Sequence, residues 1–264
     1  MRFTKNDSEK IHVVIIYSSP RQYGNTAKIS KYLEEFLRDL GAEVKMFNVF
    51  NMRIEPCLGC VSDDVKLCKF PCVINDDARK IFEAIDESIG LIIVSPIYWY
   101  NVPGPLKNLI DRLTVFENEI FISGRSRLEG KVVGFVVVGN DTGSIAVLQN
   151  LMITMNSMGA VIPPWAIAYH TDEEDPFNNS SFVMDLANVA RAVYLMSKLM
   201  IDTKSYMINW YAASEDFKKK SFELVEKINK IYEDLYEKER SSRIRFIQEK
   251  YLGKFTTKTS TSRY

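Results

Sequence analysis

Short, strongly apolar runs recur along the chain. Residues 11–17, 90–95 and 131–138 are rich in valine and isoleucine and contain few polar positions. Runs of this kind are typical of strands that are buried on both faces of a parallel sheet. Residues 42–50 alternate between apolar and polar side chains and predict another strand. Residues 161–169 predict a fifth strand, interrupted by two prolines.

Apolar residues fall at helical spacing between these runs. Ile29, Leu33 and their neighbours form one face of a helix that follows the first strand, and Gly41 stands where a helix ends in a left-handed residue. We expect Asp76 or Asp77 to be the N-cap of the next helix, which runs to about residue 86. We expect further helices over residues 105–113, 144–158 and 182–201, and a loop over residues 116–130.

Strands that alternate with helices require right-handed crossovers and a parallel sheet. The pattern therefore predicts an α/β fold: a flavodoxin-like, doubly wound, five-stranded parallel sheet of order 2-1-3-4-5. In this topology a ligand binds beyond the carboxyl ends of the first and third strands. Those ends carry the turns at residues 18–26 and 96–104, which are the two most unusual loops in the chain.

The chain changes character after residue 201. Leu224, Ile228, Ile231 and Leu235 recur at spacings of four, three and four, with lysine and glutamate on the other face. We predict a C-terminal helical extension over residues 202–264, and we expect its apolar face to dock on its own domain or on a partner subunit. Residues 1–201 form the other predicted domain, with a cysteine-rich loop at residues 57–72.

Composition excludes several classes of protein. The 264 residues carry 34 Lys and Arg against 34 Asp and Glu, so the net charge is zero and no nucleic-acid partner is expected. Only two histidines are present, which disfavours a Ser-His-Asp hydrolase or a histidine-rich metal enzyme. The polar N-terminus predicts no signal peptide. The uncharged stretches 88–106 and 142–171 contain prolines and polar residues, so we expect buried strand–loop–helix units and no membrane partner.

The turn after the first strand carries groups that suit a phosphate monoester. Ser19 and Thr26 supply hydroxyls, Arg21 supplies a cation with several donors, and Gly24 allows close approach of the backbone. All of them precede or open a helix, whose N-terminus attracts anions. The lysine of a Walker loop is absent. The alternative is an ordinary turn in which Asn25 caps the helix.

A second loop is unusually aromatic. Tyr98, Trp99 and Tyr100 are consecutive at the expected carboxyl end of the third strand. Rings and exposed backbone amides of this kind suit a flat aromatic cofactor. A hydrophobic subunit interface is the alternative, and the two interpretations are compatible.

All four cysteines lie close together in the sequence, at Cys57, Cys60, Cys68 and Cys72. Four thiolates in one loop suit a [4Fe–4S] cluster or a tetrahedral zinc ion, and unligated thiols are the remaining alternative. Loop thiolates are kept reduced in the cytoplasm, which predicts a cytoplasmic protein.

Together these motifs resemble those of the flavodoxin-like NAD(P)H-dependent FMN reductases, and within them the iron–sulfur flavoproteins. The resemblance covers residues 11–201 and rests on SSPRQYGNT, on PCLGC…C…CVINDD and on SPIYWYNVPGPLKNLIDR. Asp63 stands where the compact cysteine motif of these proteins has its third cysteine. The resemblance implies that the domain over residues 1–201 binds FMN noncovalently. It also implies a homodimer or homotetramer, with NAD(P)H as co-substrate.

The resemblance further implies roles for particular residues. The FMN phosphate would bind to Ser19, Arg21, Asn25 and Thr26. The isoalloxazine edge would be wrapped by Pro96, Ile97, Tyr98, Trp99 and Asn101. A third flavin loop would run from Asn140 to Gly143, and the metal ligands would be Cys57, Cys60, Cys68 and Cys72.

We therefore expect an FMN-dependent oxidoreductase that accepts electrons from NAD(P)H and passes them to a quinone, a flavin or a one-electron partner protein, with a [4Fe–4S] cluster as a candidate relay. Because the flavin carries the hydride chemistry, no catalytic acid–base side chain is expected. Two alternatives remain: a non-catalytic flavin and iron–sulfur electron carrier, and a flavodoxin-fold interaction protein.

Overall fold

The structure is a computed structural model that describes residues 10–212 and 214–252. Its centre is a parallel sheet of order β2-β1-β3-β4-β5, which confirms the predicted topology. The last part of the predicted extension, residues 253–264, lies outside the described residues. The five strands are β1 (His12–Tyr17), β2 (Glu43–Asn48), β3 (Gly90–Pro96), β4 (Val132–Gly139) and β5 (Ile167–Thr171).

The central strands are apolar because both faces of the sheet are covered. Along β3, Leu91 and Ile93 enter one core layer, whereas Ile92 and Val94 enter the other. All four are at most 1% exposed. The register pairs the end of β1 with the end of β3, so both strands stop at the same edge. The loops that follow them are therefore brought together there.

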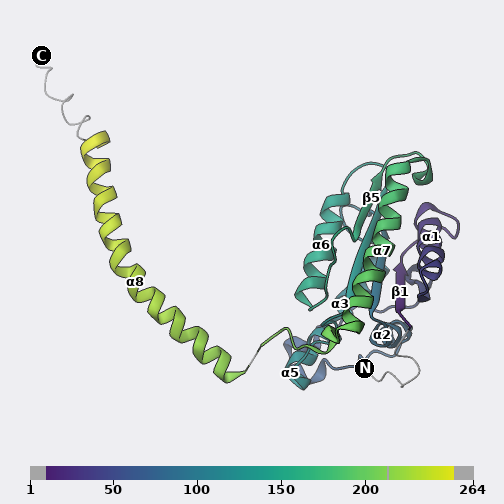
Figure 1. Cartoon of the computed structure of the whole chain (residues 1–264), viewed down its shortest axis with the longest axis horizontal. Coiled ribbons are helices and arrows are strands. Elements are labelled where there is room, and N and C mark those ends of the chain that lie inside the picture. Colours follow the sequence, from purple (N-terminus) through teal and green to yellow (C-terminus); the bar gives the residue numbers. More distant parts are fainter. Residues whose placement is uncertain (1–9, 213, 253–264) are drawn as a thin grey trace, which may run out of the picture. The chain divides into compact units, whose positions relative to one another are not determined.

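Two helical layers sandwich the sheet (Figure 1). The helices α1 (Asn25–Asp39) and α7 (Ser180–Asp202) cover one face. The other face is covered by α2 (Ala78–Glu87), α3 (Gly104–Arg112) and α6 (Ser144–Ser157). As predicted, Gly41 follows the last turn of α1 with a φ of +94°, in the left-handed region that favours glycine.

The structure corrects two sequence-based expectations. Residues 116–130 were expected to form a loop, but α4 (Thr114–Glu117) and α5 (Glu119–Ser123) occupy much of this segment. Each is barely one helical turn, which is too short for a periodic pattern to indicate. The fifth strand begins at Ile167 rather than at residue 161, because the two prolines intervene and Val161 makes only an isolated bridge to Val132.

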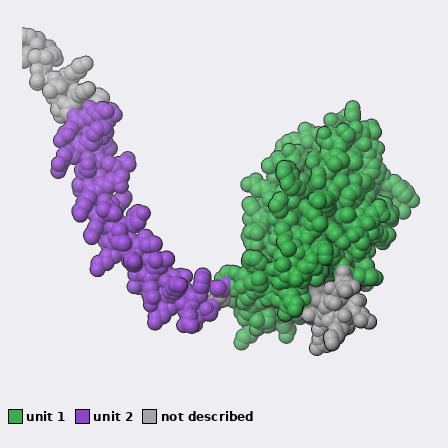
Figure 2. All heavy atoms as spheres, viewed as in Figure 1, with its two compact units in different colours: residues 1–211 green, residues 212–264 purple. Residues whose placement is uncertain are grey.

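The chain divides into two compact units, residues 1–211 and 212–264 (Figure 2). The first unit continues past α7 because the Glu129 carboxylate accepts hydrogen bonds from the backbone N–H groups of Trp210 and Tyr211. The second unit contains α8 (Glu215–Ile247), which confirms a C-terminal helix. The domain boundary at residue 202 stays a prediction. Among the described residues, no helix has the length and apolar character needed to cross a bilayer.

Lys131, at the start of β4, makes the stability of the fold depend on pH. Its ammonium donates to the carbonyls of Ser88 and Asp86 at 2.6 and 3.0 Å, and burial lowers the pKa of Lys131 to about 8. Between pH 8 and about pH 10.5 the unfolded chain keeps this proton while the folded chain loses it. The free energy of unfolding is therefore expected to rise with pH in this window, by about 3 kcal/mol at most.

The variant Lys131→Met removes the titrating group. We expect urea unfolding of this variant to show a smaller rise over the same pH window than unfolding of the wild-type protein. Equal slopes in the two proteins would contradict the assignment to Lys131.

Candidate functional site

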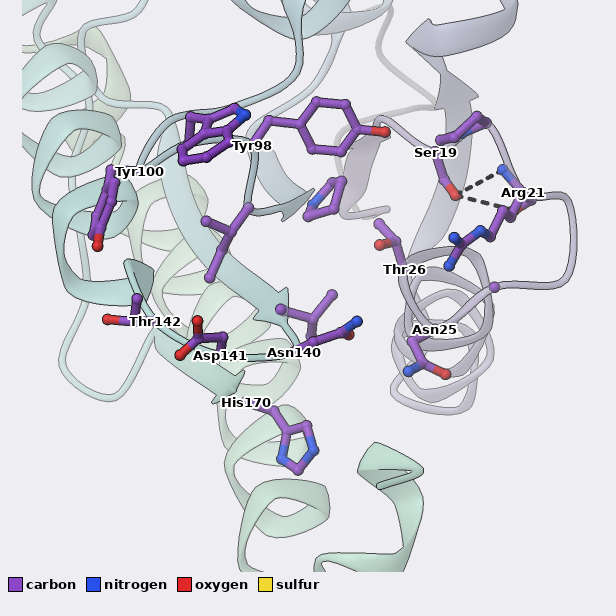
Figure 3. Close-up of a pocket in the computed structure, with 17 residues that line it drawn as sticks. Ser19, Arg21, Asn25, Thr26, Tyr98, Tyr100, Asn140, Asp141, Thr142 and His170 are labelled. Atoms are coloured by element: carbon purple, nitrogen blue, oxygen red, sulfur yellow. Dashed lines mark hydrogen bonds between the residues drawn. The ribbon is translucent and has the colours of Figure 1, made fainter. Parts of the chain in front are cut away.

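A cavity of about 550 Å³ opens at the carboxyl edge of the sheet. Its walls come from the loops after β1, β3 and β4 and from the end of β5 (Figure 3). This size is usual for a site that binds a small molecule or cofactor. The lining residues are Ser19, Pro20, Arg21, Gly24, Asn25, Thr26, Pro96, Ile97, Tyr98, Trp99, Tyr100, Val138, Gly139, Asn140, Asp141, Thr142 and His170.

One wall is the turn between β1 and α1, with Ser19, Arg21 and Thr26 gathered on the same side of the cavity (Figure 3). The cap of α1 is Gly24, and no side chain caps the helix, so the alternative in which Asn25 is the cap is wrong. The first N–H groups of α1 therefore remain available to a ligand. The helix dipole and the Arg21 guanidinium favour an anion at this position.

The Ser19 hydroxyl holds the shape of this turn. It donates to the carbonyl of Arg21 at 3.0 Å and accepts from the N–H of the same residue at 3.2 Å. Asn48, at the end of β2, makes two hydrogen bonds with the backbone of Ser19. Its Oδ1 accepts from the Ser19 N–H at 3.1 Å, and its Nδ2 donates to the Ser19 carbonyl at 2.9 Å. Asn48 was not predicted, because only the pairing of β2 with β1 brings it here.

The opposite wall is a tight turn of aromatic residues after β3. Tyr98 and Asn101 exchange two backbone hydrogen bonds of 2.8 and 3.1 Å, which leaves Trp99 and Tyr100 at the centre of the turn. These two residues have φ values of +49° and +63°, in a region that costs a side chain about 1–2 kcal/mol per residue. Strain of this kind concentrates at functional sites. The turn holds the Trp99 side chain 94% exposed.

The floor of the cavity lies between these walls, at the end of β4. Asn140, Asp141 and Thr142 line it, and His170 joins them from β5. The His170 ring is buried and lies 5.2 Å, centroid to centroid, from the Phe182 ring of α7. His170 was missed, although parallel strands that end at one edge could have indicated the end of the fifth strand.

Nine of the eleven predicted cofactor residues line this cavity, and Asn101 and Gly143 do not. Asn101 instead shapes the aromatic turn, since its Oδ1 accepts from the Val102 N–H at 2.8 Å. Gly143 caps α6 with a φ of +98°, and a Cβ there would lie 3.0 Å from the Tyr100 ring. Gly143 therefore permits the close approach of two loops.

The four cysteines occupy one region beside α3. Cys57, Cys60 and Cys68 line a cavity of about 410 Å³ together with Lys107 and Ile110 of this helix. Cys72 is buried in the adjoining core layer. Burial, and after it the neighbouring thiol of Cys60, raises the pKa of Cys68 to about 12.

Within the described part of the chain, no three His, Cys, Asp or Glu side chains come together around a position for a single metal ion. A [4Fe–4S] cluster needs a different arrangement of ligands from a single metal ion, because each thiolate binds a separate iron atom at a corner of the cubane. A cluster site therefore needs all four thiols in one region: Cys57, Cys60 and Cys68 line one cavity, and Cys72 is buried in the core layer that Cys68 also enters.

The cysteine loop is anchored by a buried ion pair. Arg112, at the end of α3, contacts the Asp76 carboxylate at 2.5 Å, and both side chains are fully buried. Arg112 also donates to the carbonyls of Glu55 and Ile74, which flank the loop on its two sides. Burial alone would raise the pKa of Asp76, but hydrogen bonds from Arg112 and from the Glu55 N–H lower this pKa below its usual range.

The sequence matches the family model described as NADPH-dependent FMN reductase over residues 11–174. The chain belongs to the NADPH-dependent FMN reductase family. Membership confirms the resemblance drawn from the loop motifs.

Proteins similar to this chain include iron–sulfur flavoproteins. One from Archaeoglobus fulgidus is 30% identical over 148 residues, or 56% of this chain and 63% of that protein. Another from Methanocaldococcus jannaschii is 34% identical over 126 residues, or 48% of this chain and 60% of that protein. The chain therefore spans less than two thirds of the length of these relatives.

Solved structures show the same fold as this FMN reductase-family chain. RosB, crystallised with 8-demethyl-8-formylriboflavin-5′-phosphate, is 15% identical, with a TM-score of 0.59 over 78% of this chain and 90% of RosB. The apo form of the NADH:FMN oxidoreductase EMOB is 18% identical, with a TM-score of 0.53 over 70% of this chain and 89% of that protein.

Proposed function

We propose that this chain is an FMN-dependent oxidoreductase that accepts electrons from NAD(P)H and delivers them to an acceptor through a [4Fe–4S] cluster. The observation on which the proposal depends is a single cavity whose two ends differ in chemistry, one suited to an anion and the other to an aromatic ring. An uncapped helix N-terminus with Arg21 suits a phosphate, and the strained aromatic turn across the cavity suits a flat ring.

FMN fits this arrangement with its phosphate at the start of α1. Arg21, Asn25 and Thr26 would bind the phosphate there through their side chains or the first backbone N–H groups of α1. Ser19 would join them when its hydroxyl turns from the Arg21 carbonyl to the phosphate. The isoalloxazine would lie against residues of the other two loops: Pro96, Ile97, Tyr98, Trp99 and Asn140. Asn101 and Gly143 act by shaping these loops.

Bound FMN would supply the hydride-accepting ring. The chain's own contribution is position and electrostatics. Backbone N–H groups of the loops after β3 and β4 would stabilise negative charge on the ring edge. We assign no side chain as an acid or base.

The cysteine loop supports the second part of the proposal. Cys57, Cys60, Cys68 and Cys72 would hold the cluster, which would supply one-electron transfer. The helix α3 begins directly after the aromatic turn, and its Lys107 and Ile110 line the cysteine cavity, so one rigid element connects the two sites. The relatives from A. fulgidus and M. jannaschii are named iron–sulfur flavoproteins.

The proposed acceptor is a one-electron partner protein, with a quinone or a free flavin as substrates of the flavin alone. We propose a homodimer or homotetramer and a cytoplasmic location, since a loop of four thiols requires reducing conditions. A non-catalytic electron carrier is the second candidate, and the exposed Trp99 favours it because a partner protein could reach this side chain.

The variant Cys57→Ser separates the two cofactors. We expect it to lose iron and to reduce a one-electron acceptor at least tenfold more slowly, while NADH or NADPH still bleaches its flavin in anaerobic stopped-flow experiments. Leu58→Ser is the matched control, because Leu58 is the exposed neighbour in the same loop and carries no thiol.

If neither NADH nor NADPH bleaches the flavin of the wild-type protein, the proposed reductase activity is contradicted, and the non-catalytic electron carrier becomes the better candidate. Equal iron content in Cys57→Ser and wild-type protein would contradict the assigned ligand.

A further inference from the structure

The helix α8 carries an apolar face that is left exposed by the described residues of its own unit, 212 and 214–252. Leu224, Val225, Ile228, Ile231 and Leu235 are each between 45% and 56% exposed, and no residue of the helix is buried. Helices in water draw most of their stability from packing of such a face, so a partner is required to explain it.

The spacing of this face is that of a two-stranded coiled coil. Apolar residues form two series along α8, each with a spacing of seven residues. The first series is Phe217, Leu224 and Ile231, and the second is Ile228 and Leu235. From Leu224 to Leu235 these positions alternate at four and three, which matches the d and a positions of a heptad. Ser221 and Lys238 occupy the next a and d positions on either side, and Val225 lies beside the seam at an e position. This 3.5-residue period indicates another helix as the occupant of the face.

The charges that flank the seam select the orientation of that helix. Lys227 and Asp234 occupy successive g positions, directly before Ile228 and Leu235. In a parallel pair, Asp234 would face Glu239 of the second copy, which is a like-charge contact. In an antiparallel pair with Ile228 opposite Ile231 of the second copy, Lys227 faces Asp234 of that copy, and this contact occurs twice by symmetry.

The same charges also select the register. Shifting the antiparallel pair by one heptad places Lys227 opposite Lys227 of the second copy in one direction, and Asp234 opposite Asp234 in the other. In the unshifted register Leu224 packs opposite Leu235, and Ile228 packs opposite Ile231. Apolar layers and charge pairs therefore agree on a single arrangement.

We propose that α8 is an association helix that pairs with α8 of a second copy of this chain as an antiparallel coiled coil centred between Ile228 and Ile231. The occupant is a second copy because the helix is complementary to itself in this arrangement. The inference is independent of the flavin and of the cysteine loop.

Charge reversal on the full-length chain tests the pairing. Lys227→Glu and Asp234→Lys each turn two attractive contacts into repulsive ones, so sedimentation velocity at low salt is expected to show about tenfold weaker association for each variant. Mixing the two variants restores association, because in the heterodimer position 227 of each chain again faces an opposite charge at position 234 of the other. The double variant Lys227→Glu/Asp234→Lys is expected to associate as the wild type does, for the same reason.

Lys230→Glu is the matched control, since Lys230 lies on the face of α8 away from the seam, and it is expected to leave association unchanged. Far-UV circular dichroism on every variant checks that α8 stays helical. Association that strengthens in Asp234→Lys would overturn the proposal in favour of a parallel pair. Unchanged association in both single variants, or no recovery on mixing, would overturn it in favour of another occupant.

Discussion

Replacing Arg112 with methionine is expected to lower the free energy of unfolding by about 3–5 kcal/mol. The substitution leaves the buried Asp76 carboxylate without its cation. It also removes the donors to the carbonyls of Glu55 and Ile74, so both ends of the cysteine loop lose an anchor. Urea unfolding measures the stability, and the iron content of the purified variant reports on the loop.

Two comparisons define this effect. Lys107→Met removes an exposed cation from the same helix and breaks only its pair with Asp111, so a loss below about 1 kcal/mol is expected. The double variant Arg112→Met/Asp76→Asn is expected to cost less than the sum of its single substitutions, because it leaves no buried charge. An additive result would show that the ion pair does not carry the effect.

Replacing Arg21 with methionine is expected to weaken FMN binding about 10- to 100-fold, since a hydrogen bond to a charged group contributes about 1.5–3 kcal/mol. Arg21 lies beside the uncapped start of α1, where the proposed phosphate would be desolvated on one side. Fluorescence titration of apoprotein with FMN measures the change.

Riboflavin supplies the control for this variant, because it has the ring but not the phosphate. We expect the affinity for riboflavin to be the same in Arg21→Met and in the wild-type protein. Gln22→Met, at an exposed neighbouring position, is expected to bind FMN normally. An equal loss for FMN and riboflavin would place Arg21 at the ring and contradict the proposed orientation.

The sheet could be predicted because its strands carry their own pattern. Doubly buried strands such as β3 carry a continuous apolar run, here Leu91–Val94, and such a run is visible in a single sequence. The alternation of strands with helices then determines the edge where the site lies. Ser19, Arg21 and Tyr98 were found because they follow strands directly.

The groups that support the site were not predictable in the same way. Asn48 reaches Ser19 only through the pairing of β2 with β1, and Arg112 meets Asp76 across 36 positions of the chain. No local pattern indicates such contacts, since each partner is an ordinary polar residue in its own segment. The short helices α4 and α5 were missed because their core residues are too few to show a period.

We propose that one chain carries FMN at the carboxyl edge of the sheet and an iron–sulfur cluster in the cysteine loop. The most direct test is the visible absorption spectrum of full-length protein purified without oxygen, with iron and acid-labile sulfide measured on the same sample. We expect two flavin bands above a broad iron–sulfur shoulder, with about four irons per chain. Colourless protein that takes up no added FMN would contradict the flavin site, and flavin bands without iron would contradict the cluster.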